Sequence, residues 1–269
     1  MGQVQAVVSD LDGTFWSGQA VVHPTTLAAV AELRARDVKL LFATGRRYAS
    51  AQRALDPLGL AGPAVLMSGA VGADLRTGEE WHRQAFSPKT GQAVLDAFVS
   101  QGLAPVVYVG DDRTDTVITV GCSTSPTHRV TLGPPDPIGL EPEITAGRVV
   151  GFGVCGIDQA FTPALEAVAE QIRGTAQGWL GPDHVMGGWT LMVGPGGISK
   201  VSAISGWCGT HGLTPDQVLA VGDGSNDLEM LAWAGTSVAV VGGVTAANGS
   251  DHVIDRPQDG GWARLLDLL

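Results

Sequence analysis

Short apolar runs alternate with helical patterns in the N-terminal part of this chain, and this alternation constrains the fold most. Three runs have the length and composition of buried strands, namely "VQAVVS" (4–9), "VKLLFATG" (38–45) and "PAVLMSG" (63–69). Between them, "TTLAAVAELRAR" (25–36) and "RRYASAQRAL" (46–55) carry apolar residues three and four positions apart, as helices do. Strands that alternate with helices predict a parallel, doubly wound sheet with right-handed crossovers.

From about residue 84 the order changes to helix–strand–strand, twice over. The helical pattern at 87–102 precedes apolar runs at 104–110 and 116–121, and loops or short edge pieces are expected over 123–148. A strand, a helix and a returning strand follow, and the α/β alternation then resumes to the end of the chain. We therefore expect an α/β core, built on a doubly wound parallel sheet and formed by residues 1–83 and 190–269. An α+β domain formed by residues 84–189 is expected to be inserted into this core.

Composition bounds the class of protein. The 269 residues carry a formal net charge of -11, which argues against a nucleic-acid surface, since such surfaces need clustered Lys and Arg. The three cysteines have no CxxC spacing and favour reduced thiols over a zinc site or a disulfide framework. The N-terminus resembles no signal peptide, and no apolar stretch reaches the length of a membrane span. We expect a soluble, cytoplasmic protein.

Carboxylates follow two of the predicted strands directly. Asp10 and Asp12 end the first strand, and Asp223, Asn226 and Asp227 end the run "QVLAVGDGSND". Ligands of open α/β sheets bind outside the carboxyl ends of the strands, so neighbouring strands would bring these groups together. Each "DG" alone is an ordinary turn signal, but so many negative charges in one small volume call for a cation. A few carboxylates with water and a substrate oxygen suit Mg²⁺.

Hydrogen-bond donors for a phosphoryl group occur at other strand and helix ends. Thr44, the Gly45 amide and Arg46 lie where the second strand ends, and Lys200 lies in the first turn of a predicted helix. An exposed lysine or arginine is the ordinary explanation of either cation alone. Taken together, the residues predict phosphoryl transfer, with Asp10 as nucleophile and Asp12 as the acid that protonates the leaving oxygen.

At this point the chain resembles the haloacid dehalogenase superfamily. Its four motifs are matched in order by "DLDGT" (10–14), "FATGR" (42–46), "GGISK" (196–200) and "GDGSND" (222–227). The insert between the second and third motifs is similar to the C2B cap of the Cof-type branch.

The resemblance implies a role for each matched position. It implies that Asp10, the backbone carbonyl of Asp12, and Asp223 hold Mg²⁺, with Asn226 and Asp227 supporting the metal site. Thr44, Gly45, Arg46 and Lys200 would bind the substrate phosphate.

The sequence departs from the branch at two places. Ser68-Gly69-Ala70 stands where many members have Asn-Gly-Ala, and "VVGGVTAANGSD" replaces the usual Gly-Asn-Ala, so contacts of those asparagines are not carried over. The short cap resembles those of phosphoglycolate and sugar-phosphate phosphatases. Its candidate contacts with the leaving group are Asp111 to Asp115, Arg129, His184, Trp189 and Thr190, each of which is also an ordinary surface or packing residue.

The leading hypothesis is a Mg²⁺-dependent phosphatase that hydrolyses a phosphate monoester of a small metabolite, such as a sugar phosphate or a phosphoglycolate-like acid. A phosphomutase or phosphotransferase would use the same aspartyl-phosphate, and the motifs do not separate the two. A non-catalytic phospho-acceptor or ligand-binding module is the third hypothesis, although such a protein would be expected to have lost Asp10, Asp12 or Lys200. The sequence identifies neither the substrate nor the oligomeric state.

Overall fold

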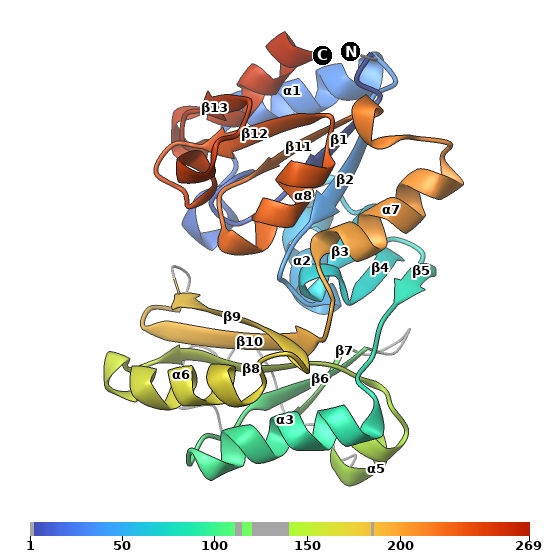
Figure 1. Cartoon of the computed structure of the whole chain (residues 1–269). Coiled ribbons are helices and arrows are strands. Elements are labelled where there is room, and N and C mark those ends of the chain that lie inside the picture. The colour runs from blue at the N-terminus through green and yellow to red at the C-terminus, as the bar shows by residue number, and fades with distance from the viewer. Residues whose placement is uncertain (1–2, 111–114, 120–139, 184–185) are drawn as a thin grey trace. The chain divides into compact units, whose positions relative to one another are not determined.

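The computed structural model describes residues 3–110, 115–119, 140–183 and 186–269, and it divides into two compact units. The first unit contains residues 1–46, 50–82 and 199–269, and the second contains 47–49 and 83–198. Both units are drawn in Figure 1.

The first unit is built on a sheet of eight strands in the order β13-β12-β11-β1-β2-β3-β4-β5. The strands are β1 (Ala6–Ser9), β2 (Lys39–Ala43), β3 (Pro63–Leu66), β4 (Val71–Asp74), β5 (Glu80–Arg83), β11 (Val218–Gly222), β12 (Thr236–Val240) and β13 (His252–Ile254). The strands from β13 to β3 are parallel, and β4 pairs antiparallel with β3. The predicted doubly wound parallel sheet is confirmed.

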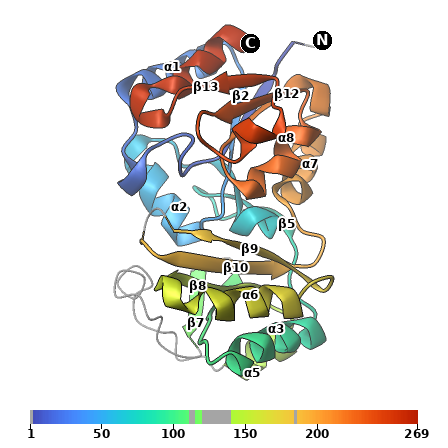
Figure 2. The ribbon, with the colours of Figure 1, turned by 60° about the vertical axis from the view of Figure 1, so that its left-hand side comes forward.

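Helices cover both faces of this sheet because its strands are apolar on both sides. On one face α7 (Lys200–Thr210) and α8 (Leu228–Trp233) pack against Ala6 and Val8 of β1. On the other, α1 (Pro24–Ala35) packs beside the 3₁₀ helix η9 (Gly261–Leu268), near the C-terminus (Figures 1 and 2). In the first unit Phe15 also meets Phe42 and Trp262 edge to face. Residues alternate between these two cores along β1, so β1 lies between two helical layers.

The second unit is an antiparallel sheet of five strands in the order β7-β6-β8-β10-β9. These are β6 (Val106–Gly110), β7 (Asp115–Thr119), β8 (Val149–Ile157), β9 (Ala176–Pro182) and β10 (Trp189–Pro195). The helices α3 (Pro88–Ser100), α5 (Leu140–Thr145) and α6 (Thr162–Gln171) contribute to one core with the sheet, in which Phe98 packs on Phe152. Figure 2 shows α3 and α6 on the same side of this sheet, as expected of an α+β domain.

Several details differ from the sequence-based expectations. The second unit extends to Ile198 rather than 189, because β10 pairs along its whole length with β9. The strands β4, β5 and β9 were not expected, and 140–145 is helical within a stretch expected to be loop. The expected C-terminal helix is of the 3₁₀ type. Asp111 to Thr114, Arg129 and His184 lie outside the described residues.

The remaining elements are short. They are α2 (Tyr48–Leu55) and the 3₁₀ turns η1 (Gly18–Ala20), η2 (Asp56–Leu58), η3 (Met67–Gly69), η4 (Gln159–Phe161), η5 (Pro215–Gln217), η6 (Ser225–Asp227), η7 (Thr245–Asn248) and η8 (Pro257–Asp259). Within the part of the chain that the structure describes, no helix combines the length and apolar character that crossing a bilayer requires.

Candidate active site

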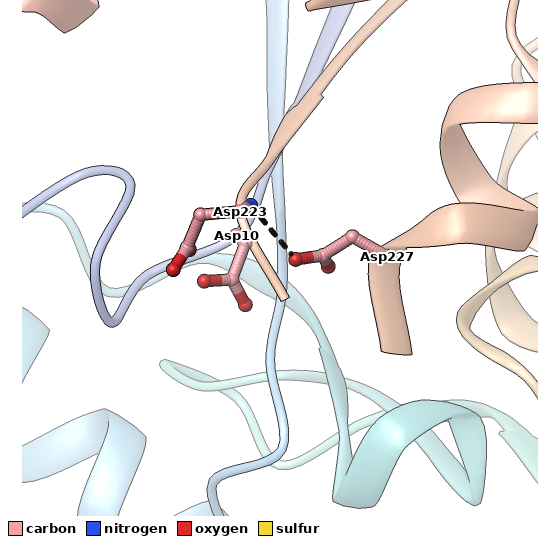
Figure 3. Close-up of side chains that lie close together, drawn as sticks. All are labelled: Asp10, Asp223 and Asp227. Atoms are coloured by element: carbon pink, nitrogen blue, oxygen red, sulfur yellow. Dashed lines mark hydrogen bonds between the residues drawn. The ribbon is translucent and has the colours of Figure 1, made fainter. Parts of the chain in front are cut away.

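Adjacent parallel strands bring the two acidic strand ends together. β1 lies next to β11 with Ser9 opposite Val221, and the Asp10 amide donates to the Val221 carbonyl at 2.9 Å. Asp10 and Asp223 therefore leave neighbouring strands at the same edge of the sheet. With Asp227, each offers a carboxylate oxygen within 4.8 Å of the other two (Figure 3). The prediction that these carboxylates meet depended on β1 and β11 being neighbours, and they are.

Lys200 is the cation within this cluster. It is the first residue of α7, and its side chain is fully buried. Nζ donates to Oδ1 of Asp10 at 2.6 Å and to Oδ1 of Asp227 at 2.6 Å. Burial opposes the charge on the ammonium, but the two carboxylates outweigh it and raise the pKa of Lys200. The lysine is therefore a fixed positive charge beside the predicted nucleophile.

Asp227 uses both of its carboxylate oxygens for contacts within the protein. Oδ2 accepts the amide of Asp223 at 3.1 Å, drawn as the dashed line in Figure 3, and the amide of Gly224 at 2.9 Å. Oδ1 accepts the Lys200 ammonium. Asp227 therefore holds the turn that carries Asp223, which suits a residue that supports a metal site better than a direct ligand.

The loop after β1 packs directly on Asp223. Thr14 Oγ1 donates to Oδ1 of Asp223 at 2.6 Å. Gly13 has a positive φ of 86°, and a Cβ placed on it would lie 2.4 Å from Oδ2 of Asp223. These two residues stand inside the "DLDGT" motif, but no role is predicted for them from the sequence. Their place inside this motif was the signal in the sequence by which they could have been identified.

The charges of the cluster are not balanced by the protein. When all three carboxylates are ionised, they share one ammonium among the described residues, which leaves two negative charges uncompensated. Burial raises the pKa of Asp10 well above its ordinary value of 3.8; the charges of Asp227 and Asp223 add to this, whereas Lys200 acts in the opposite direction. The pKa of Asp223 is also raised, again chiefly by burial.

A divalent cation fits this site on two counts. Its charge equals the missing positive charge, and the available donors are hard carboxylate oxygens. Oδ2 of Asp10 has no hydrogen-bond partner among the described side chains, so it is available to such an ion.

Asp12 does not join the three-carboxylate cluster. Its side chain forms a bidentate pair with Arg46, with Nε to Oδ2 at 2.6 Å and Nη2 to Oδ1 at 2.6 Å. The indole of Trp16 donates to the same Oδ1 at 2.9 Å. The metal role predicted for Asp12 concerns its backbone carbonyl, so the Arg46 pairing leaves that prediction untouched.

The remaining predicted phosphate-binding groups, Thr44, Gly45 and Arg46, follow β2 directly. Thr44 is buried, and its Oγ1 accepts the amide of Arg46 at 3.1 Å. Asn226 Nδ2 donates to Oγ of Ser68 at 3.4 Å, and Ser68 Oγ lies 3.5 Å from where a Cβ on Gly45 would be. All nine predicted site residues thus belong to the first unit.

Two candidate substrate contacts in the second unit have structural explanations. Thr190 donates to Oδ2 of Asp183 at 2.6 Å and accepts the amide of Gly156 at 3.2 Å. Trp189 is partly buried and packs against the core of its own unit. Both residues stabilise the second unit whatever else they do.

Comparisons with known proteins agree with this geometry. The family model of haloacid dehalogenase-like hydrolases matches residues 7–121 and 165–266. Pyridoxal phosphate phosphatase YbhA of Escherichia coli K12 is 22% identical over 88% of this chain and 87% of its own. The HMP-PP phosphatase of Serratia proteamaculans is 28% identical over 86% of this chain and 81% of its own. The solved structure of the subclass IIB sugar phosphatase BT4131 superimposes with a TM-score of 0.78 at 19% identity, covering 98% of each chain, and so shares the fold.

Proposed function

The chain belongs to the haloacid dehalogenase-like hydrolases, in the Cof-type branch that its motifs predict, and on this basis we propose that it is a Mg²⁺-dependent phosphatase. Its substrate would be a phosphate monoester of a small cytoplasmic metabolite, and Asp10 would carry the phosphoryl group as an aspartyl-phosphate. Relatives named for pyridoxal phosphate and HMP-PP support this substrate class.

One observation carries the proposal, namely the arrangement of Asp10. Its Oδ1 is held by the buried ammonium of Lys200, while Oδ2 has no partner among the described residues. A nucleophilic carboxylate needs this combination, because one oxygen must be oriented and the other accessible. A structural salt bridge needs no free oxygen and no second buried carboxylate beside it.

In the first step, a carboxylate oxygen of Asp10 attacks phosphorus and the bond from phosphorus to the leaving oxygen breaks. Asp12 donates its proton to that oxygen, which leaves as an alcohol. Lys200 and the Thr44 hydroxyl stabilise the charge that develops on the phosphoryl oxygens. The Gly45 amide and Arg46 contribute further hydrogen bonds to the phosphate.

In the second step, Asp12 accepts a proton from water as that water attacks phosphorus. The bond between phosphorus and the Asp10 oxygen breaks, inorganic phosphate leaves, and the Asp10 carboxylate is restored. Asp12 thus returns to its protonated state, and protons balance over the cycle.

Mg²⁺ would be held by Asp10, Asp223 and the backbone carbonyl of Asp12, with Asn226 and Asp227 in support. When bound, it supplies positive charge that offsets the carboxylates and the phosphoryl group. The uncompensated charge of the cluster supports this assignment.

The proposal is tested by phosphate release from a panel containing pyridoxal phosphate, sugar phosphates, phosphoglycolate, HMP-PP and nucleotides. Each reaction is run with Mg²⁺ and with excess EDTA, for the wild type and for Asp10→Asn. We expect release that requires the metal and is lost in Asp10→Asn. A stable phosphoprotein that passes its group to an added sugar phosphate would indicate a mutase instead. If no member of the panel yields either phosphate or a phosphoprotein, the proposal is contradicted.

A further inference from the structure

Trp16 follows Asp12 by four residues and is fully buried, yet no step of the proposed reaction uses it. Its backbone amide donates to the Leu11 carbonyl at 3.1 Å, and its own carbonyl accepts the Gly13 amide at 3.0 Å. The indole ring meets Phe15 edge to face at 5.8 Å between centroids. Backbone and ring are therefore both held, and the direction of the indole N–H is defined by the core.

That N–H donates to Oδ1 of Asp12 at 2.9 Å. Oδ1 also accepts Nη2 of Arg46, and Oδ2 accepts Nε. A carboxylate presents about four lone-pair sites, and these contacts occupy two on Oδ1 and one on Oδ2. Among the contacts of the described residues, the site that stays open is on Oδ2, so a proton carried by this carboxylate would be held there.

Trp16 also acts on the cation of the pair. The Arg46 guanidinium carbon lies 5.2 Å from the centroid of the Trp16 ring, within the range of a cation–π contact. The Asp12 side chain is 34% exposed, so without these contacts it would have several rotamers available. The tryptophan thus contacts both members of the pair from the buried side.

We propose that Trp16 is a positioning residue that holds Asp12 so that Oδ2 is the oxygen that exchanges the proton with the leaving group. This inference rests on the proposed function, because it assumes that Asp12 is the general acid. It predicts that loss of the indole N–H weakens acid catalysis specifically, and leaves the attack by Asp10 intact.

The test compares two classes of substrate in Trp16→Phe, which keeps a ring but removes the N–H. An alkyl phosphate needs a proton on its leaving oxygen, whereas p-nitrophenyl phosphate has a leaving group stable enough to depart without one. The ratio kcat/KM is measured for both, since it reports the steps up to release of the leaving group and excludes hydrolysis of the phosphoenzyme. We expect a loss of about tenfold or more for the alkyl phosphate and less than about threefold for p-nitrophenyl phosphate.

Trp262→Phe is the matched control. Trp262 is fully buried in the same aromatic cluster, and its indole N–H donates to Oγ of Ser9 at 2.9 Å rather than to Asp12. We expect Trp262→Phe to change kcat/KM for the two substrates by the same factor. Equal losses in Trp16→Phe, no loss at all, or the same selective loss in Trp262→Phe would each overturn the inference.

A second measurement stands independently of activity and of the folding of Trp16→Phe. The indole N–H signals of the ¹⁵N-labelled protein are compared between the wild type and Asp12→Ala. We expect one signal to move upfield in Asp12→Ala, because its charged acceptor is gone, and that signal to belong to Trp16. Unchanged indole signals overturn the inference, whereas a wild type that yields neither phosphate nor a phosphoprotein with any member of the substrate panel overturns the proposed function alone.

Discussion

Nζ of Lys200 donates a 2.6 Å hydrogen bond to Oδ1 of Asp10, and the lysine side chain has no exposure to solvent. The two residues come from different parts of the chain and meet because β1 lies in the centre of the sheet while α7 packs against it. Removing one partner of a buried ion pair leaves the other charge uncompensated, which is more costly than loss of an exposed pair.

Lys200→Met is therefore expected to lower the free energy of unfolding by about 3–5 kcal/mol and to abolish activity. Chemical denaturation in EDTA measures the first effect. Lys89→Met serves as the control, since Lys89 is exposed, and we expect a change within about 0.5 kcal/mol. A Lys200→Met protein as stable as the wild type would show that the carboxylates do not depend on this ammonium.

The raised pKa of Asp10 predicts how stability depends on pH without metal. Burial, with the charges of Asp227 and Asp223, keeps the proton on Asp10 in the folded protein at pH values where the unfolded chain has released it. This contribution is complete below about pH 4 and is lost as the pH rises through the raised pKa. In EDTA, the free energy of unfolding of the wild type should thus fall as the pH rises above about 4. The decrease should be smaller in Asp10→Asn, which has no carboxylate to titrate at this position. Urea titrations over a pH series measure the free energy of unfolding of both proteins. If it depends on pH identically in the wild type and in Asp10→Asn, the prediction is contradicted.

Mg²⁺ is expected to raise the melting temperature of the wild type, because an ion that binds only the folded state stabilises it by mass action. At about 100 times its dissociation constant the gain is about 2.7 kcal/mol. Asp223→Asn should lose most of this shift, whereas Asp251→Asn, whose carboxylate instead binds Ser237, should retain it. Calorimetry with a Mg²⁺ titration checks both variants, and an equal shift in Asp223→Asn would exclude this carboxylate as a ligand.

Gly13→Ala tests the packing of the loop against Asp223. The new Cβ would lie 2.4 Å from Oδ2 of Asp223, on a backbone with φ of 86°. Gly249 has a φ of 84° with no atom within 4 Å of an added Cβ, so Gly249→Ala carries the same backbone strain without the collision. Gly249→Ala should lose about 1–2 kcal/mol of stability from the backbone strain alone. Gly13→Ala should lose more than Gly249→Ala because of the collision, and only Gly13→Ala should also lose the Mg²⁺ shift and activity. If Mg²⁺ raised the melting temperatures of Gly13→Ala and Gly249→Ala equally, Asp223 would be able to move away from the added methyl group and still bind the ion.

Local sequence patterns predicted the parallel strands of the first unit, but not β4 and β5. Strands such as 4–9 and 38–45 are apolar on both sides, which only a sheet covered by helices on both faces satisfies. The order of the four motifs likewise predicted that Asp10, Thr44, Lys200 and Asp223 would come from the ends of neighbouring elements, and the structure brings them to one edge. The boundary at 189 was less well defined, because a strand pattern does not say which sheet the strand joins.

The sequence alone therefore determined which residues the site contains. The ends of strands and the starts of helices follow from the hydrophobic periodicity and from the turn residues. Which groups pair with which was decided by packing. Asp12 and Asp223 look alike in sequence, yet one pairs with Arg46 beside a buried Trp16 and the other accepts from Thr14. Those choices depend on distances between segments far apart in the chain, where a change of a few ångströms in packing selects a different partner for a charge, and no local pattern carries that information.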